Sequence, residues 1–192
     1  MSTEWIEAEW DGVRFRATRE EVHRLGYWHE TFHCFVLHPE GLLLQRRSAQ
    51  KRDFPEMFDI TAAGHLLYGE GVQDGVRELK EEIGLLRRLD ELTPIGTIED
   101  ELILPPFFDR ERCHVFLTES DQPLESFLLQ AEEVDCLVAV RTGDFISFLR
   151  GETEMMSVAA GPAHFVGRNE FVPHGENYRL LLADQLEKLI HP

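Results

Sequence analysis

The chain has 192 residues, with 19 Lys and Arg against 36 Asp and Glu, so its formal net charge is −17 at pH 7. This length fits a single domain, and a hydrophobic content of 43% is enough to build a core, which argues against a disordered chain. The negative charge disfavours nucleic acid polymers and anionic membrane surfaces as partners, because both attract Lys and Arg. Charge alone indicates no function, since many soluble proteins carry a similar surplus of carboxylates.

The cysteines and the N-terminal segment indicate a cytoplasmic protein. The three cysteines lie in apolar, strand-like runs without a CxxC pair, which is typical of reduced core thiols: Cys34, Cys113 and Cys136. Three glutamates among the first ten residues are unlike the positive region of a signal peptide. No apolar run approaches the roughly 20 residues that a membrane-spanning helix needs.

The first part of the chain predicts short strands and one capped helix. Residues 5–17 alternate around Asp11-Gly12, which is a hairpin signal. Thr18 is expected to cap a short helix that ends near Gly26. Further strands are expected at 31–38, 42–46 and 58–61.

The rest of the chain predicts alternating helices and strands, and so one α+β domain over residues 1–192 with mixed strand order. Segment 151–175 is interrupted by Gly and Pro and carries no clear pattern. The stripe Leu181-Leu182-Leu186 could seal a homodimer as easily as cap the core. Helices are expected at 72–83, around 123–130, at 144–150 and at 176–190, and strands near 94–99, 113–118 and 134–140.

The helix predicted at 72–83 places three carboxylates on one face. Glu78, Glu81 and Glu82 stand at i, i+3 and i+4, where like charges cost a few tenths of a kcal/mol per pair. They also occupy the last turn, where the helix dipole disfavours negative charge. One interpretation is a solvated acidic face relieved by Arg77 and Lys80. The other is a site for a hard cation, because carboxylate oxygens suit Mg²⁺ or Mn²⁺.

The segment from Gly64 to Leu85 resembles the Nudix box. That signature is Gly, five residues, Glu, seven residues, Arg-Glu, an aliphatic residue, any residue, Glu-Glu, any residue, Gly and an aliphatic residue. Residues 77–85 match at every fixed position, and Gly64 and Glu70 match the first half. Six residues rather than seven separate Glu70 from Arg77, which would rotate Glu70 by about 100° relative to the helix face.

The resemblance implies a Nudix fold, a mixed β-sheet between helices, and a hydrolase that uses Mg²⁺ or Mn²⁺. It assigns metal binding to Glu78, Glu81 and Glu82, a backbone ligand near Ala63-Gly64, and to Arg77 the bracing of the loop through Glu70. The metals would neutralise a diphosphate and lower the pKa of a water that attacks phosphorus, with one glutamate as general base. A further carboxylate commonly completes such sites, and four candidates remain open: Asp109, Glu111, Glu132 and Glu133.

A second resemblance covers residues 20–34, which are similar to the entry segment of the isopentenyl-diphosphate isomerase branch of the Nudix superfamily. Three imidazoles and carboxylates could bind Zn²⁺, Mn²⁺ or Fe²⁺, although these histidines could also be structural. Ala63 stands where the isomerase uses a cysteine, and a methyl group cannot move a proton, which argues against isomerase activity. The positions that match the metal site of that branch are His23, His29, His65, Asp109 and Glu111.

Substrate contacts are expected next to the box. Arg46 and Arg47 belong to a basic cluster that could receive phosphates or could be only a charged hairpin loop, and Phe58 could stack on a base. The hypothesis is a metal-dependent hydrolase of a diphosphate bond in a nucleoside-diphosphate-linked or related small molecule. An isomerase-like enzyme and a non-catalytic ligand-binding module are the alternatives.

Overall fold

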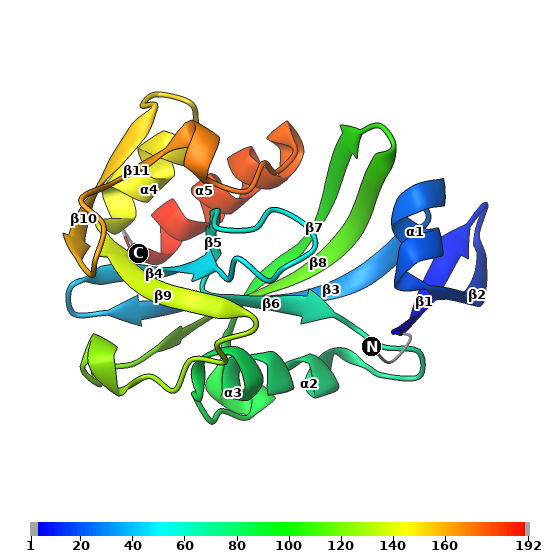
Figure 1. The fold of residues 1–192 in the computed structure, drawn as a ribbon, viewed down its shortest axis with the longest axis horizontal. Coiled ribbons are helices and arrows are strands. Elements are labelled where there is room, and N and C mark those ends of the chain that lie inside the picture. Colours follow the sequence, from blue (N-terminus) through cyan, green and yellow to red (C-terminus); the bar gives the residue numbers. More distant parts are fainter. Residues whose placement is uncertain (1–3, 191–192) are drawn as a thin grey trace.

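A mixed β-sheet with helices on both faces forms the centre of the molecule (Figure 1). The structure is a computed structural model that describes residues 4–190, so residues 1–3 and 191–192 of the predicted domain lie outside it. One path of neighbouring strands through the sheet is β11-β10-β9-β4-β3-β1-β2, and β7 and β8 join it through β3. Strand β3 runs antiparallel to β4 and β6 and parallel to β8. The predicted α+β class with mixed strand order is confirmed.

The strands and helices have the following bounds. The strands are β1 (Trp5–Trp10), β2 (Val13–Thr18), β3 (Trp28–His38), β4 (Gly41–Arg47), β5 (Phe58–Ile60), β6 (Ala62–His65), β7 (Thr93–Leu104), β8 (Phe107–Glu119), β9 (Val134–Val140), β10 (Met155–Ala160) and β11 (Phe165–Gly167). The α-helices are α1 (Arg19–Leu25), α2 (Val72–Gly75), α3 (Arg77–Ile83), α4 (Thr142–Leu149) and α5 (Glu176–Ile190).

The N-terminal hairpin and helix α1 form as their sequence predicts. Asp11 and Gly12 make the turn between β1 and β2 with positive φ angles of 49° and 75°. The Thr18 side chain accepts from the backbone N–H of Glu21, and the Glu21 carboxylate accepts from the backbone N–H of Thr18. Gly26 ends α1 in the left-handed conformation, with φ 70°. These caps fix the short helix that carries His23.

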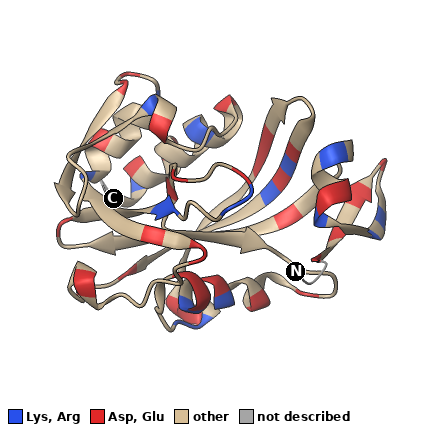
Figure 2. Cartoon of the chain, in the orientation of Figure 1, with Lys and Arg blue, Asp and Glu red and all other residues tan. Residues whose placement is uncertain are grey.

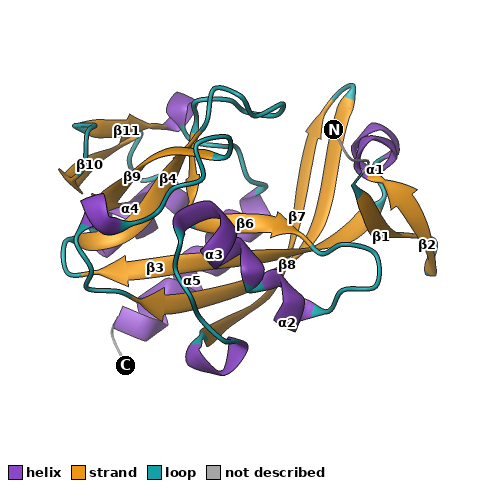
Figure 3. Ribbon diagram, turned by 60° about the horizontal axis from the view of Figure 1, so that its bottom comes forward, coloured by secondary structure: helices purple, strands orange, loops and turns teal. Residues whose placement is uncertain are grey.

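The two faces of β3 bury two separate core clusters. Phe32 packs on one side with Leu79 and Ile83 of α3, which lies with α2 below the sheet in Figure 1 and in front of it in Figure 3. Phe35 points the other way, into a cluster that includes Phe145 of α4. Because side chains alternate along the strand, a single sheet can pack against helices on both of its faces.

The predicted helix at 72–83 is interrupted. Val76 separates α2 from α3, and the backbone N–H of Leu79 bonds to the Val76 carbonyl three residues back, at 3.2 Å. Gly75 faces the sheet, where a Cβ would lie 2.5 Å from the Cβ of Phe32. The glycine thus allows the helix to approach β3 closely.

Two other predictions differ from the structure. The helix expected at 123–130 is wrong, because only a single 3₁₀ turn forms at Leu124–Ser126. Buried Phe127 and a bond from the Gln130 N–H to the Glu82 carbonyl at 3.0 Å hold this segment extended against the end of α3. Strands β7 and β8 are longer than expected, and they form a projecting hairpin arm (Figure 1).

Helix α5 covers the core with only part of its leucine stripe. Tyr178, Leu182 and Leu186 are buried, whereas Leu181 is 42% exposed, so the stripe Leu181-Leu182-Leu186 is not one buried face. Among residues 4–190, none of the helices combines the length and the apolar character needed to cross a membrane.

Candidate active site

Charged side chains from distant parts of the sequence line a cavity of about 270 Å³. Figure 2 shows the acidic segments on α3 and on the β7–β8 arm that contribute to this charge. The carboxylates of the cavity wall include those of Glu78, Glu81, Glu82, Asp59, Asp100, Asp109, Glu111 and Glu133. The structure therefore brings the three box glutamates and the two acids of β8 to one cavity.

The box loop is built around the carboxylate of Glu78. A Cβ on Gly64 would lie 2.2 Å from the Glu78 Oε1 atom, so any larger residue at this position would force the Glu78 carboxylate to move. Arg77 pairs with Glu78, and it also donates to Glu70 Oε2 at 2.9 Å and to the His65 carbonyl at 3.2 Å. The brace between Glu70 and Arg77 thus forms despite the shorter spacing.

Burial raises the pKa values of two box glutamates. Glu82 is 4% exposed and accepts hydrogen bonds from Gln45 Nε2 at 3.0 Å and from the Ala63 N–H at 3.1 Å. Its burial and then the charge of Glu78 raise the Glu82 pKa to about 8. Burial also outweighs Arg77 and raises the pKa of Glu78 to about 7. A divalent ion would reverse these shifts, because it stabilises the ionised carboxylates and displaces their protons.

Replacing Gly64 with Ala should weaken divalent-metal binding by about 10–100-fold, because the new methyl group would push the Glu78 carboxylate out of place. Titration calorimetry with Mn²⁺ measures the effect. Gly143→Ala is the matched control, since a Cβ there meets nothing within 4 Å. An unchanged affinity in the Gly64 variant would contradict the role given to Glu78.

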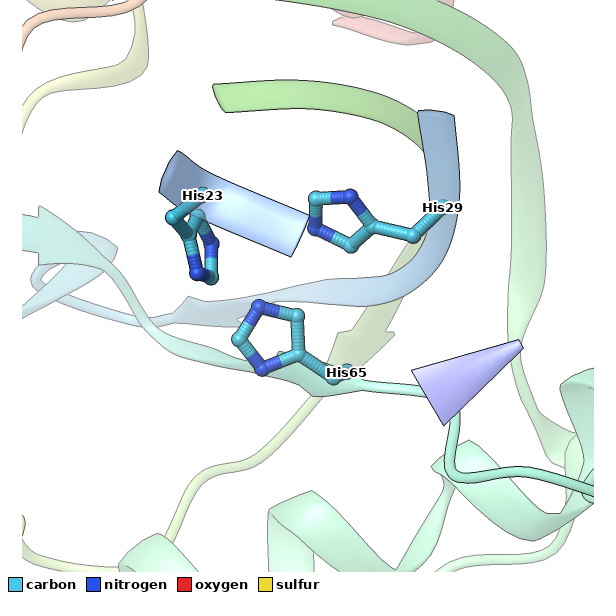
Figure 4. A group of neighbouring side chains, drawn as sticks. All are labelled: His23, His29 and His65. Carbon is cyan, nitrogen blue, oxygen red and sulfur yellow. The ribbon is translucent and has the colours of Figure 1, made fainter. Parts of the chain in front are cut away.

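The side chains of a second group, His23, His29 and His65, point toward one another (Figure 4), and His23 and His65 line the cavity. Each ring uses Nδ1 for a bond to an oxygen that can only accept, so Nδ1 carries the proton and Nε2 keeps its lone pair. Such orientation by an outer hydrogen bond is typical of histidines that bind metal. The accepting atoms are the Arg19 carbonyl at 2.8 Å, the Tyr27 carbonyl at 3.2 Å and Glu4 Oε1 at 3.2 Å.

Asp109 and Glu111 face the same imidazoles at distances too long for hydrogen bonds. Asp109 Oδ1 lies 3.4 Å from His23 Nε2 and 3.5 Å from His29 Nε2, and Glu111 Oε1 lies 3.7 Å from His29 Nε2. His29 Nε2 and Asp109 Oδ1 are buried and have no hydrogen-bond partner within the described structure. Ligands of one ion, bonded at about 2.1 Å, stand about 3–3.5 Å apart. The residues present therefore fit a cation among them.

The pKa shifts in this group agree with that fit. Burial lowers the pKa of His65 to about 4, so its ring is neutral at neutral pH. Burial also acts to lower the pKa of His29, but Glu111 and Asp109 outweigh it and raise the value. The two carboxylates thus favour a positive charge at His29 Nε2, which a proton or a metal ion can supply.

The substrate residues predicted from the sequence are only partly brought to the cavity. Arg47 lines it, yet its guanidinium is engaged by Asp59 Oδ2 at 3.0 Å and by the Asp53 carbonyl. The structure places Arg46 elsewhere, paired with Asp135 on the surface, and Phe58 in the core, 5% exposed. Of the acids left open, Glu133 lines the cavity and pairs with Lys51, whereas Glu132 is exposed.

The group His174, Asp100 and Asp59 forms a further part of the cavity wall, and no sequence pattern predicts it. His174 Nδ1 donates to Asp100 Oδ2 at 2.7 Å, and its Nε2 lies 3.5 Å from Asp59 Oδ1. Burial acts to lower the His174 pKa, but the two aspartates outweigh it and raise the value to about 10. His174 belongs to the segment 151–175, which has no readable pattern, so only the folded chain reveals this contact.

Comparisons with known proteins support the resemblance to the Nudix family. The NUDIX domain family model matches residues 27–158. An uncharacterized Nudix hydrolase of Clostridium acetobutylicum is 38% identical over 177 residues, which are 85% of this chain and 86% of that protein. An isopentenyl-diphosphate Delta-isomerase of Corynebacterium diphtheriae is 33% identical over 68% of this chain and 73% of its own length. A MutT protein from Methanosarcina mazei has a similar fold, with a TM-score of 0.57 at 14% identity over 86% of this chain and 96% of that one.

Proposed function

Because the chain belongs to the Nudix hydrolase family, we propose that it uses a divalent metal ion to cleave a diphosphate bond in a small molecule, of the nucleoside-diphosphate-linked kind or a related one. The observation that carries the proposal is the convergence of Glu78 and Glu82 on one cavity, with pKa values raised to about 7 and about 8. Two neighbouring carboxyls whose burial opposes ionisation have little structural use. They suit a site that is completed by a cation.

The box side chains would divide the work as follows. Glu78, Glu81 and Glu82 would hold Mg²⁺ or Mn²⁺, which supplies charge neutralisation of the diphosphate and makes water more acidic. Arg77 keeps the loop and the helix together through Glu70, so the carboxylates stay in place. One box glutamate would accept the proton of the attacking water, and Lys51 at the cavity wall would face phosphate oxygens.

The group His23, His29, His65, Asp109 and Glu111 would hold a second kind of cation, Zn²⁺, Mn²⁺ or Fe²⁺, because nitrogen ligands dominate it. The support is the buried, unpartnered His29 Nε2 and Asp109 Oδ1 atoms. A cation there would add positive charge to a cavity whose many carboxylates would otherwise repel a diphosphate.

Replacing His29 with Asn is expected to remove about one equivalent of tightly bound Mn²⁺ or Zn²⁺ per chain, since it deletes the central ligand of this group. Metal analysis of the purified protein after dialysis measures the stoichiometry. His114→Asn is the control, because His114 bonds to Glu30 and Thr97 outside the cavity. Equal metal content in the His29 variant and the wild type would exclude this site.

An isomerase is the second candidate, favoured by the isomerase relatives and by the histidine group. Ala63 weighs against it, because it lines the cavity with a methyl group and offers no ionisable atom. The test is incubation with Mg²⁺ or Mn²⁺ and a panel of nucleoside-diphosphate conjugates and prenyl diphosphates, followed by mass spectrometry. Hydrolysis yields two fragments whose summed mass exceeds the substrate by one water, whereas isomerisation leaves the mass unchanged. Binding without any product would indicate a non-catalytic module.

A further inference from the structure

A third polar group lies beyond the histidine site, one step farther along the same two strands. His33 follows His29 by four residues on β3, and Cys113 follows Glu111 by two residues on β8, so all four side chains point to the same side of the sheet. His33 is 4% exposed and Cys113 is fully buried. One ligand atom from each of His33, Glu111 and Cys113 lies within 4.8 Å of the others.

The distances within this group resemble those between the ligands of one ion. Glu111 Oε2 lies 3.5 Å from His33 Nε2 and 3.4 Å from Cys113 Sγ. Thr31 Oγ1 stands 3.3 Å from His33 Nε2 and 3.4 Å from Glu111 Oε2. Each contact between oxygen and nitrogen or between two oxygens is longer than the usual hydrogen bond. About 3.3–3.6 Å is the separation expected for neighbouring ligands around a tetrahedral ion with bonds of 2.0–2.3 Å.

Helix α5 fixes the orientation of the His33 ring. His33 Nδ1 and the hydroxyl of fully buried Tyr178 are 2.8 Å apart. When Nδ1 donates to this hydroxyl, Nε2 is left with its lone pair and faces Glu111. An outer partner on the far nitrogen is the usual support of a metal-binding histidine.

The carboxylate of Glu111 stands between the two groups and turns one oxygen to each. Its Oε1 lies 3.7 Å from His29 Nε2, and its Oε2 lies 3.5 Å from His33 Nε2. A carboxylate with this placement can bridge two cations, one through each oxygen.

We propose that His33, Cys113 and Glu111 bind a further divalent cation of borderline softness, Zn²⁺ or Co²⁺, and that Glu111 links it to the cation of the histidine site. Thiolate and imidazole ligands select such ions over Mg²⁺. Binding releases the Cys113 thiol proton to the solvent, as for any thiolate ligand. The proposal rests on the proposed function in one respect, because Glu111 also belongs to the histidine site assigned there.

The test loads the metal-free protein with Co²⁺ and follows its absorption. A thiolate bonded to Co²⁺ gives a charge-transfer band in the near ultraviolet, which oxygen and nitrogen ligands do not give. The wild type should show this band and bind one more equivalent of Co²⁺ than Cys113→Ser or His33→Asn. The band should remain in Cys34→Ser, the matched control, because Cys34 is as buried as Cys113 but lies outside the group.

Absence of the band from the wild type, or its persistence in Cys113→Ser, would overturn the proposal. X-ray absorption of the wild type loaded with Zn²⁺ provides a measurement that needs no variant, and sulfur at about 2.3 Å from zinc is the expected result. A first shell without sulfur excludes the site even if Cys113→Ser fails to fold. Glu82→Gln should keep the band while losing hydrolysis, which separates failure of this proposal from failure of the proposed function.

Discussion

Glu82→Gln should lower the rate of diphosphate hydrolysis by about 10²–10⁴-fold and leave the fold intact. The amide has the shape of the protonated carboxyl, which a pKa of about 8 makes the main form at neutral pH in the metal-free protein. Its oxygen can still accept from the Ala63 N–H and from Gln45. It cannot become an anion, so it neither binds the cation strongly nor accepts a proton from water. Turnover with Mg²⁺ and thermal unfolding of both proteins measure the two halves of this expectation.

Glu132→Gln serves as the control for the removal of one negative charge, because Glu132 is exposed and does not line the cavity. It should retain the wild-type rate. A near-normal rate of turnover in Glu82→Gln would contradict the assignment of the box as the catalytic centre. Loss of the unfolding transition would show instead that Glu82 is needed for the fold.

His174→Ala should reduce the free energy of unfolding by about 3 kcal/mol near pH 6, because it leaves two buried aspartates without their shared partner. The size of the effect should depend on pH. The folded pKa of His174, about 10, lies above the value of about 6.5 in an unfolded chain. Its contribution is therefore fully present below pH 6.5 and is lost as the pH rises through 10.

Urea unfolding of the wild type and of His174→Ala at pH 6, 8 and 10 tests this pH dependence. The difference between the two proteins should shrink steadily across the series, while other titrating groups cancel in the comparison. His164→Ala provides a control on an exposed histidine of the same segment. A difference that stays constant from pH 6 to pH 10 would mean that His174 is not held as a cation.

Local signals predicted the elements that carry the box and the N-terminal hairpin. The turn at Asp11-Gly12, the caps Thr18 and Gly26, and the box glycine Gly64 each act through backbone conformation or close approach, so short stretches of sequence are enough to identify them. The convergence of Glu78, Glu81 and Glu82 follows from helical spacing, which is also local. The resemblance to the isomerase branch of the superfamily identified His23, His29 and His65 as candidate metal ligands.

Longer-range features could not be predicted in the same way. Arg46 and Arg47 are neighbours on β4, and only the placement of the cavity decides which of the two faces it. Residues 123–130 have a composition compatible with a helix, but their contacts with the end of α3 hold them extended. His174 lies at the cavity because the whole C-terminal segment folds back over the sheet, and no local sequence pattern predicts that course of the chain.

The interruption of the box helix at Val76 lies between the two partners of the brace, Glu70 and Arg77. Close packing of Gly75 on Phe32 anchors α2 to strand β3 just before this break. Helix α3 begins directly after Val76, and Arg77 at its start reaches Glu70 across the six residues between them. These contacts keep Arg77 and the box glutamates of α3 in their places around the helix axis. A sequence template with rigid spacing between glutamate and arginine would overlook chains of this kind.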